Sequence, residues 1–212
     1  MIIRNWLSLR DIHITLSVIV LGITATGCLG TTSVPQDHYY RFPEKFEIPK
    51  NISYPPINII AVEQLKTEGL YRERPLLFVD AKNPLELQQY HYRHWIKAPT
   101  YLIQDNMVQF FRQTKIADKV VRYEPRLNAD IIIGGRILNF EQIISSEITK
   151  VKVTIEIEIV SNNSPDKNLN KVYEANENVN SNTIHDAVEA FGRALNKVYA
   201  ILLSDIARQS NQ

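Results

Sequence analysis

Residues 150–160, KVKVTIEIEIV, are the stretch that decides the fold. Apolar side chains stand at every second position from Val151 to Ile159, and lysine, threonine and glutamate occupy the positions between them. Because successive side chains of a strand point to opposite faces, this pattern predicts a strand with one buried and one solvent-exposed face. Such strands are typical of a sheet that has one face in water.

Six other segments have the composition of strands or extended chain. The first is expected at a sheet edge, because Pro43 cannot donate a hydrogen bond to a neighbouring strand. The Gly134-Gly135 pair predicts a bulge or bend in another. The segments are residues 38–46, 57–62, 70–80, 87–95, 130–140 and 172–179.

Two segments have the periodicity of helices. Pro99 suits the first turn of a helix, and apolar residues recur at helical spacing as far as Phe111. Thr183 and Asp186 have the spacing of a capping box, and apolar residues then recur three and four positions apart up to Ile206. The order of these elements predicts an α+β fold, a mixed or largely antiparallel sheet with two helices packed on one face.

The first 27 residues have the anatomy of a secretory signal peptide. Two arginines precede an apolar run, residues 12–25, which ends in small residues before Cys28, the only cysteine of the chain. This run is shorter than the roughly 20 apolar residues that a spanning helix needs. Residues 25–28, ATGC, resemble the bacterial lipobox, so we expect cleavage before Cys28 and lipidation of its thiol. An uncleaved anchor with a buried thiol is the alternative, and it explains neither the small residues nor the place of the cysteine.

The predicted organisation is a signal peptide (1–27), a lipidated N-terminus and tether (28–37) and a single α+β auxiliary lipoprotein domain (38–212). At about 3.4 Å per residue, the tether spans no more than roughly 30 Å. In Gram-negative bacteria an aspartate directly after the lipidated cysteine commonly retains a lipoprotein in the inner membrane. Leu29 stands at that position, so we expect a protein lipid-anchored to the periplasmic face of the outer membrane.

The charge balance limits the partners. The chain has 24 basic and 23 acidic residues, and removal of the signal peptide leaves the two signs equal in number. Without a basic surplus the chain is not expected to bind nucleic acid. For the same reason, electrostatic attraction to anionic lipid is not expected to assist the acyl anchor.

The predicted strand that ends at Trp95 carries two candidate binding motifs. His91 and His94 could ligate a metal ion, but an odd separation places them on opposite faces of a strand, and no further ligand stands at a zinc-like spacing. Tyr90, Tyr92 and Trp95 could form a stacking platform, although aromatic residues in strands more often pack on cross-strand neighbours. We therefore expect no metal and no cofactor here, and a core or partner-surface role for the aromatic residues.

Charged residues offer two more candidates. Glu156 and Glu158 share one face of their strand and could act as an acid/base pair, but two lysines share that face, and such charges usually solvate an exposed sheet surface. Residues 72–74, RER, could contact lipid headgroups or a partner, or serve solubility alone. The chain has no nucleophile elbow, no phosphate-binding glycine loop and no Cys/His pair once Cys28 is lipidated. We therefore expect a protein that is not an enzyme.

Several short motifs follow one another between residues 39 and 206. They are GLY at 69–71, RPLLF at 74–78, LQQYHY at 87–92 followed by Trp95, Pro99 with Leu102, and the segment 130–140 with Gly135, Leu138 and Phe140. In this order, and behind a lipobox, they resemble the ABC-type transport auxiliary lipoprotein family. No single motif is diagnostic, but the resemblance extends over nearly all of the mature chain.

Members of that family are periplasm-facing lipoproteins that accompany ABC transporters carrying mammalian-cell-entry domain proteins, and these systems move phospholipid or other hydrophobic cargo between two membranes. The resemblance implies a sheet with two packed helices. It also implies a mammalian-cell-entry domain protein with its ABC permease and ATPase as partners, and it is compatible with a homo-oligomer. Cys28 is the only functional position that a motif assigns.

Two other functions stay open at this point. One is a periplasmic lipid-binding carrier that holds an acyl chain between sheet and helices. An apolar interior cavity of roughly several hundred Å3 would favour the carrier, and a filled core would favour docking. The other is an assembly lipoprotein that pilots a secretin or serves export of a surface polymer.

Substitution of the lipobox cysteine tests the anchor. Palmitate should label the wild-type protein in growing cells and should not label Cys28→Ser, because the thiol is the acyl acceptor. Labelling is measured by metabolic incorporation followed by gel fluorography. Equal labelling of the two proteins would remove the basis for the predicted localisation.

Overall fold

The computed structural model describes residues 34–49, 57–181 and 183–210. The signal peptide and the lipidation site predicted within residues 1–28 lie outside the described residues. Contacts between residues gather Asp37–Gln212 into one compact unit. In the part of the chain that the structure describes, no helix is long and apolar enough to cross a membrane.

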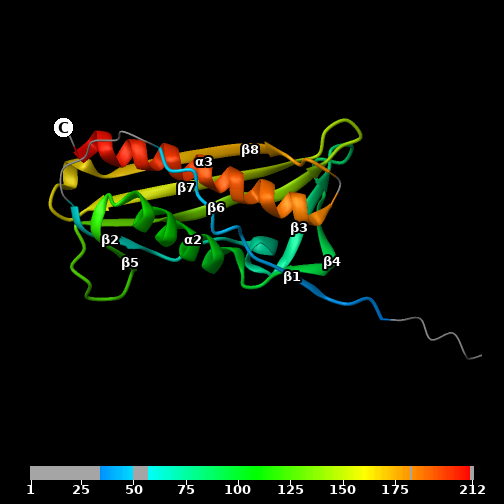
Figure 1. The fold of residues 1–212 in the computed structure, drawn as a ribbon, viewed down its shortest axis with the longest axis horizontal. Coiled ribbons are helices and arrows are strands. Elements are labelled where there is room, and N and C mark those ends of the chain that lie inside the picture. The colour runs from blue at the N-terminus through cyan, green and yellow to red at the C-terminus, as the bar shows by residue number, and fades with distance from the viewer. Residues whose placement is uncertain (1–33, 50–56, 182, 211–212) are drawn as a thin grey trace, which may run out of the picture. The chain divides into compact units, whose positions relative to one another are not determined.

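A mixed sheet of eight strands forms the centre of this unit (Figure 1). Its longest strands, β6 (Ile131–Ile144) and β7 (Lys150–Ser161), pair antiparallel along most of their length. β8 (Leu169–Asn178) pairs antiparallel with the other edge of β7. The five alternating apolar side chains of β7 are at most 1% exposed, as its sequence pattern predicts.

The second edge of β6 is shared by two strands. β2 (Ile57–Val62) pairs in parallel with the first residues of β6, and β3 (Pro75–Asp80) pairs in parallel with its last residues. β5 (Ala117–Arg122) lies parallel to β2, β4 (Leu87–Trp95) antiparallel to β3, and β1 (His38–Tyr40) parallel to β4. The sheet therefore divides into two arms on this side.

Two helices, α2 (Pro99–Thr114) and α3 (Ile184–Ser210), lie over one side of the sheet (Figure 1). α2 contacts β5 and β2, and α3 contacts β7 and β8. The helices meet where the Tyr199 ring lies 5.3 Å from the Phe110 ring, measured between centroids. The predicted α+β fold is confirmed.

Four aromatic side chains join the parts of the molecule, and we call them the aromatic cluster. They come from the segment after β1, from the end of β4, from β6 and from α3: Phe42, Trp95, Phe140 and Phe191. Each is at most 6% exposed, and the centroids of the neighbouring rings lie 4.5 to 6.0 Å apart. At these distances the rings make tilted and edge-to-face contacts, which are the favourable arrangements of aromatic pairs.

Three strand predictions differ from the structure. Of residues 38–46 only the first three form a strand, because the chain then leaves the sheet edge and Phe42 enters the core. The strand predicted from residue 70 begins only at Pro75, and Gly69–Arg72 forms a short 3-10 helix, η1. β5 was not predicted, because its sequence ADKVVR has three charged residues and no apolar alternation.

One of the two hydrogen bonds of the predicted capping box is present at the start of α3, where the Asp186 N–H donates to Thr183 Oγ1 at 3.2 Å. The bulge in β6 is not at the glycine pair. The register of β6 with β7 shifts between Ile137 and Asn139 and is unbroken at Gly135, which has a φ of +137°. A Cβ at that glycine would lie 2.0 Å from the Glu156 carbonyl oxygen, so the glycine serves a close approach of two backbones.

The two glycines with positive φ make a matched test of this close approach. Gly69→Ala should lower the free energy of unfolding by only about 1 kcal/mol, because a side chain there meets nothing within 4 Å and the cost is that of the left-handed backbone. Gly135→Ala should lower it by more than about 3 kcal/mol, because the backbone of β7 must also move. Urea unfolding followed by circular dichroism measures both. Similar values for the two variants would show that the contact does not constrain the sheet.

Candidate functional site

The chain enters the folded unit at β1, directly after the predicted tether. β1 is a three-residue strand at the sheet edge, so its backbone makes few hydrogen bonds to β4. Side-chain contacts are needed to keep it in place. The Tyr39 ring lies between two partners, the His94 ring with centroids 5.7 Å apart and the Arg74 guanidinium 5.0 Å from the ring centroid. His94 Nε2 also lies 3.3 Å from Asp37 Oδ1. These contacts fix the first residues of the unit against the end of β4.

The segment after β1 is then bound along α3. Phe42 belongs to the aromatic cluster, and Pro43 packs so close to Gly192 of α3 that a Cβ there would lie 2.8 Å from the proline Cδ. Further along, the Glu47 N–H donates to Asn196 Oδ1 at 3.0 Å, and Asn196 Nδ2 donates to the Glu47 carbonyl at 3.1 Å. Residues 42–47, which follow β1, are therefore held to α3 by packing and by hydrogen bonds.

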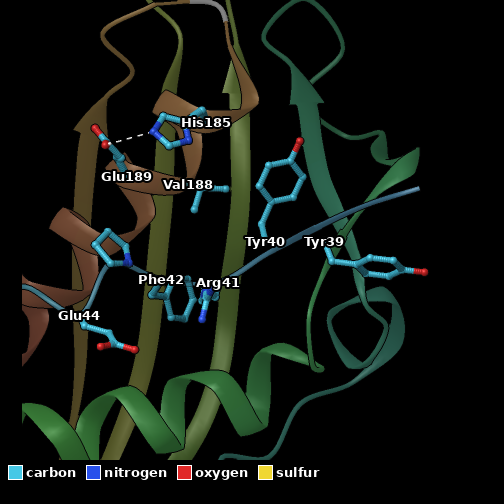
Figure 2. Close-up of a pocket in the computed structure, with 9 residues that line it drawn as sticks. Tyr39, Tyr40, Arg41, Phe42, Glu44, His185, Val188 and Glu189 are labelled. Carbon is cyan, nitrogen blue, oxygen red and sulfur yellow. Dashed lines mark ion pairs between the residues drawn. The ribbon is translucent and has the colours of Figure 1, made fainter. Parts of the chain in front are cut away.

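A groove of about 580 Å3 lies between this segment and the first turns of α3 (Figure 2). Val188 at its base is buried, while Arg41, Glu44 and His185 are exposed. His185 Nε2 lies 3.4 Å from Glu189 Oε1, the ion pair drawn in Figure 2. The groove is lined by residues 39–44 with His185, Val188 and Glu189. Exposed charged side chains therefore surround an apolar base in this groove.

The structure separates the two histidines that could have ligated a metal ion. His91 is exposed, and His94 is held by Asp37 and Tyr39. Among residues 34–49, 57–181 and 183–210, no group of three or more His, Cys, Asp or Glu side chains could hold a metal ion.

The three aromatic residues of β4 do not form one platform. Trp95 is 1% exposed in the aromatic cluster. The Tyr90 hydroxyl donates to Gln142 Oε1 at 2.9 Å, and its ring lies 4.6 Å from the Phe78 ring between centroids. Tyr92 is exposed. The predicted core role is confirmed for Trp95, and a partner-surface role for Tyr92 stays a prediction.

The charged candidates have structural partners. Glu156 forms an ion pair with Arg136 of the neighbouring strand, and Glu158 is exposed. Arg72 Nε donates to the Thr67 carbonyl at 2.9 Å, and Arg74 Nε donates to the Trp95 carbonyl at 3.1 Å. Arg72 therefore stabilises the turn around η1, and Arg74 stabilises the end of β4. The two arginines have structural roles beyond solubility.

Sequence patterns did not single out Glu141, which follows Phe140 in β6. It is 6% exposed, and one of its carboxylate oxygens accepts hydrogen bonds from the Tyr71 hydroxyl at 2.8 Å and from the Phe140 N–H at 2.7 Å. Burial raises the pKa of this carboxyl, although Tyr71, the Phe140 amide and Lys152 in β7 oppose the rise. Burial also raises the pKa of Tyr71, and the carboxylate raises it further. The pair fastens η1 onto the sheet.

The space between the sheet and the helices is filled by side chains. Besides the aromatic cluster, Phe110, Phe111 and Tyr199 are fully buried there, and their rings lie 5.3 Å apart between centroids. Aliphatic residues from every long strand complete the core. In the described residues the layer between sheet and helices therefore has the packing of a solid core, and the groove of Figure 2 lies at its edge.

Comparisons with solved structures show where this fold occurs. A crystal structure of a Xanthomonas campestris protein of family DUF330 superposes with a TM-score of 0.70 and 14% sequence identity, covering 82% of this chain and 98% of that one. The chain has the fold of that protein. A second crystal structure, of an uncharacterized protein, has a TM-score of 0.60 and 13% identity, and covers 82% of this chain and 99% of the other. No family model matches the chain, and no curated protein matches it.

Two glutamates on the same side of the sheet should respond to pH with opposite signs. The raised pKa of Glu141 means that the native chain keeps this proton when the unfolded chain has lost it, so the stability contributed by the group falls as pH rises through the unfolded value. Hydrogen bonds, first from Asn176, lower the pKa of Glu174, so its contribution is present above the unfolded value and is lost as pH falls.

Matched substitutions measure this difference. Relative to wild type, Glu141→Gln should become more stable as pH rises from about 3.5 to 7, and Glu174→Gln should become less stable over the same range, which spans the ordinary pKa of glutamate near 4.3. Urea unfolding across this range gives both slopes. Parallel slopes for the two variants would contradict the assignment of Glu141 as a carboxyl whose pKa is raised by burial.

Proposed function

We propose that the chain is a non-enzymatic, membrane-anchored lipoprotein subunit of an ABC-type intermembrane lipid transport system, and that it docks the system at the periplasmic face of the outer membrane. Its partners are a mammalian-cell-entry domain protein with the ABC permease and ATPase. The lipobox at Cys28, Leu29 after it and the ordered motifs between residues 39 and 206 support this proposal. The DUF330 fold is compatible with it.

The observation that carries the docking role is the filled interior. A carrier needs a cavity that takes up most of its ligand, on the order of 300 to 1,000 Å3. The aromatic cluster and the rings of Phe110, Phe111 and Tyr199 occupy the layer where an acyl chain would have to lie. This favours a module that binds through its surface, and it argues against the carrier.

The N-terminal segment supports the same function. A docking subunit must transmit the hold of its lipid anchor to the folded domain. Phe42 is buried in the core, and the Asn196 amide makes two hydrogen bonds to the Glu47 backbone, so the segment after the tether is fixed to α3. The domain therefore stays rigidly connected to the first residue of the unit, Asp37.

Crosslinking in the native cells tests the partner. After treatment with a short amine-reactive crosslinker, affinity purification of the lipidated protein should recover a mammalian-cell-entry domain protein, identified by mass spectrometry. Cys28→Ser is the matched control, because it keeps the folded domain and removes the anchor; it should recover less of the partner. Genes for an ATPase, a permease and a mammalian-cell-entry protein beside this one would agree with that result. Repeated absence of this partner from cells that express it would contradict the proposal.

A further inference from the structure

Two hairpin turns come together at one end of the sheet. β3 and β6 run parallel and end side by side, with Asp80 opposite Ile144. The Ala81 N–H then donates to the Ile144 carbonyl at 2.9 Å, so the β3–β4 turn (81–86) and the β6–β7 turn (145–149) begin next to each other. Figure 1 shows both turns at the right-hand end of the molecule. We call them the paired tips.

Each of the paired tips exposes one aliphatic side chain. Leu85 is 100% exposed and Ile148 is 59% exposed. Within residues 37–210 that the structure describes, they are the two most exposed large hydrophobic side chains. Exposed apolar residues are common singly, but two that stand this far out in adjacent turns indicate a surface that meets an apolar environment.

Backbone donors of the first tip are hydrogen-bonded locally. Asn83 N–H donates to the Asp80 carbonyl at 2.8 Å, Lys82 N–H to Asp80 Oδ1 at 2.9 Å, and Glu86 N–H to the Asn83 carbonyl at 3.1 Å. These backbone donors are thereby satisfied within the turn. A turn with satisfied donors can approach the interface of a bilayer at lower cost than one with unpaired N–H groups.

β1 begins on the side of the sheet that leads to the paired tips. β1 is parallel to β4, with His38 opposite Arg93, and β4 begins at Leu87, immediately after the first tip. The N-terminal end of β1 therefore faces the same end of the sheet as the paired tips. The distance from the level of Arg93 to that of Leu87 is about 20 Å at 3.4 Å per residue. The nine steps from Cys28 to Asp37 reach roughly 30 Å, so the tether can place the lipidated cysteine level with the paired tips.

We infer that the paired tips contact the membrane surface, with Leu85 and Ile148 entering the interface of the bilayer that holds the acyl anchor. This inference rests on the lipid anchor of the proposed function. The anchor confines a bilayer within reach of this end of the sheet, which is why the occupant is lipid rather than a protein. The tips carry Lys82 together with Glu86 and Glu147, so they have no positive surplus. The contact is apolar, and it should not depend on anionic lipid or on salt.

A fluorophore on the first tip tests the contact. Cys28 is the only native cysteine, so Leu85→Cys gives the lipidated protein a single free thiol for a nitrobenzoxadiazole label. The full lipidated protein is placed in phosphatidylethanolamine and phosphatidylglycerol vesicles that contain a nitroxide-labelled phosphatidylcholine. The label at position 85 should shift its emission to the blue and lose fluorescence to the nitroxide. Adding Ile148→Glu should reverse part of both changes, because a charge at the second tip opposes entry.

Ile201→Cys is the matched control. Ile201 is 46% exposed and belongs to the C-terminal half of α3. This half of the helix lies at the end of the sheet opposite the paired tips (Figure 1). A label there should show neither change. Equal, unshifted emission from the two positions, in protein whose Cys28 carries acyl groups by mass spectrometry, would overturn this inference and leave the proposed anchor intact. A bare Cys28 in protein that does not remain on the vesicles would overturn the proposed function, and the inference with it.

Discussion

The aromatic cluster is the contact on which the rest of the structure depends. Phe42, Trp95, Phe140 and Phe191 come from four elements that are distant in sequence, and their contacts join the N-terminal segment, β4, β6 and α3 at one point. Burial of each ring contributes roughly 1.5 to 3 kcal/mol, and each favourable ring pair adds about 0.5 to 1.5 kcal/mol. Phe42 therefore has two roles in the cluster. It attaches the segment that follows the tether to the core, and its ring fills space between the sheet and α3 that a ligand would otherwise need.

The long strand β6 sets the arrangement of everything around that cluster. One of its edges is fully used by β7, while the other is shared between β2 at its start and β3 at its end. β2 and β5 then have α2 above them, and β7 and β8 have α3. The arm made of β3, β4 and β1 carries the chain entry and the first of the paired tips. The strands that contact the helices most are therefore β2, β5, β7 and β8, whereas the chain enters the unit on the arm of β3, β4 and β1.

The sequence predicts the parts whose environment is simple. β7 has one buried face and one face that is mostly half-buried, and its apolar alternation from Val151 to Ile159 is unbroken, so both the strand and its orientation follow from the pattern. α3 has a continuous apolar stripe, and Thr183 caps its first turn. β5 was missed because its residues pair through the backbone while carrying charges outward. Glu141 was missed because its burial depends on Tyr71, seventy residues away in the chain, and no local pattern encodes such a contact. Cys28, the one assigned functional residue, lies outside the described residues, so its role still rests on the lipobox.

The orientation that the paired tips would impose has a consequence for the partner. With this end of the sheet at the bilayer, β7 runs away from the membrane and β8 returns toward it. Twelve residues of β7 at about 3.4 Å per residue place the opposite end roughly 40 Å above the membrane. That opposite end bears β5, the turn that follows it and the C-terminal turns of α3 (Figure 1). A short tether alone would let the domain tilt freely about Asp37. A second, apolar contact from the tips removes part of that freedom before any partner arrives, and a partner then meets a surface of fixed height and direction, which lowers the entropy lost on association.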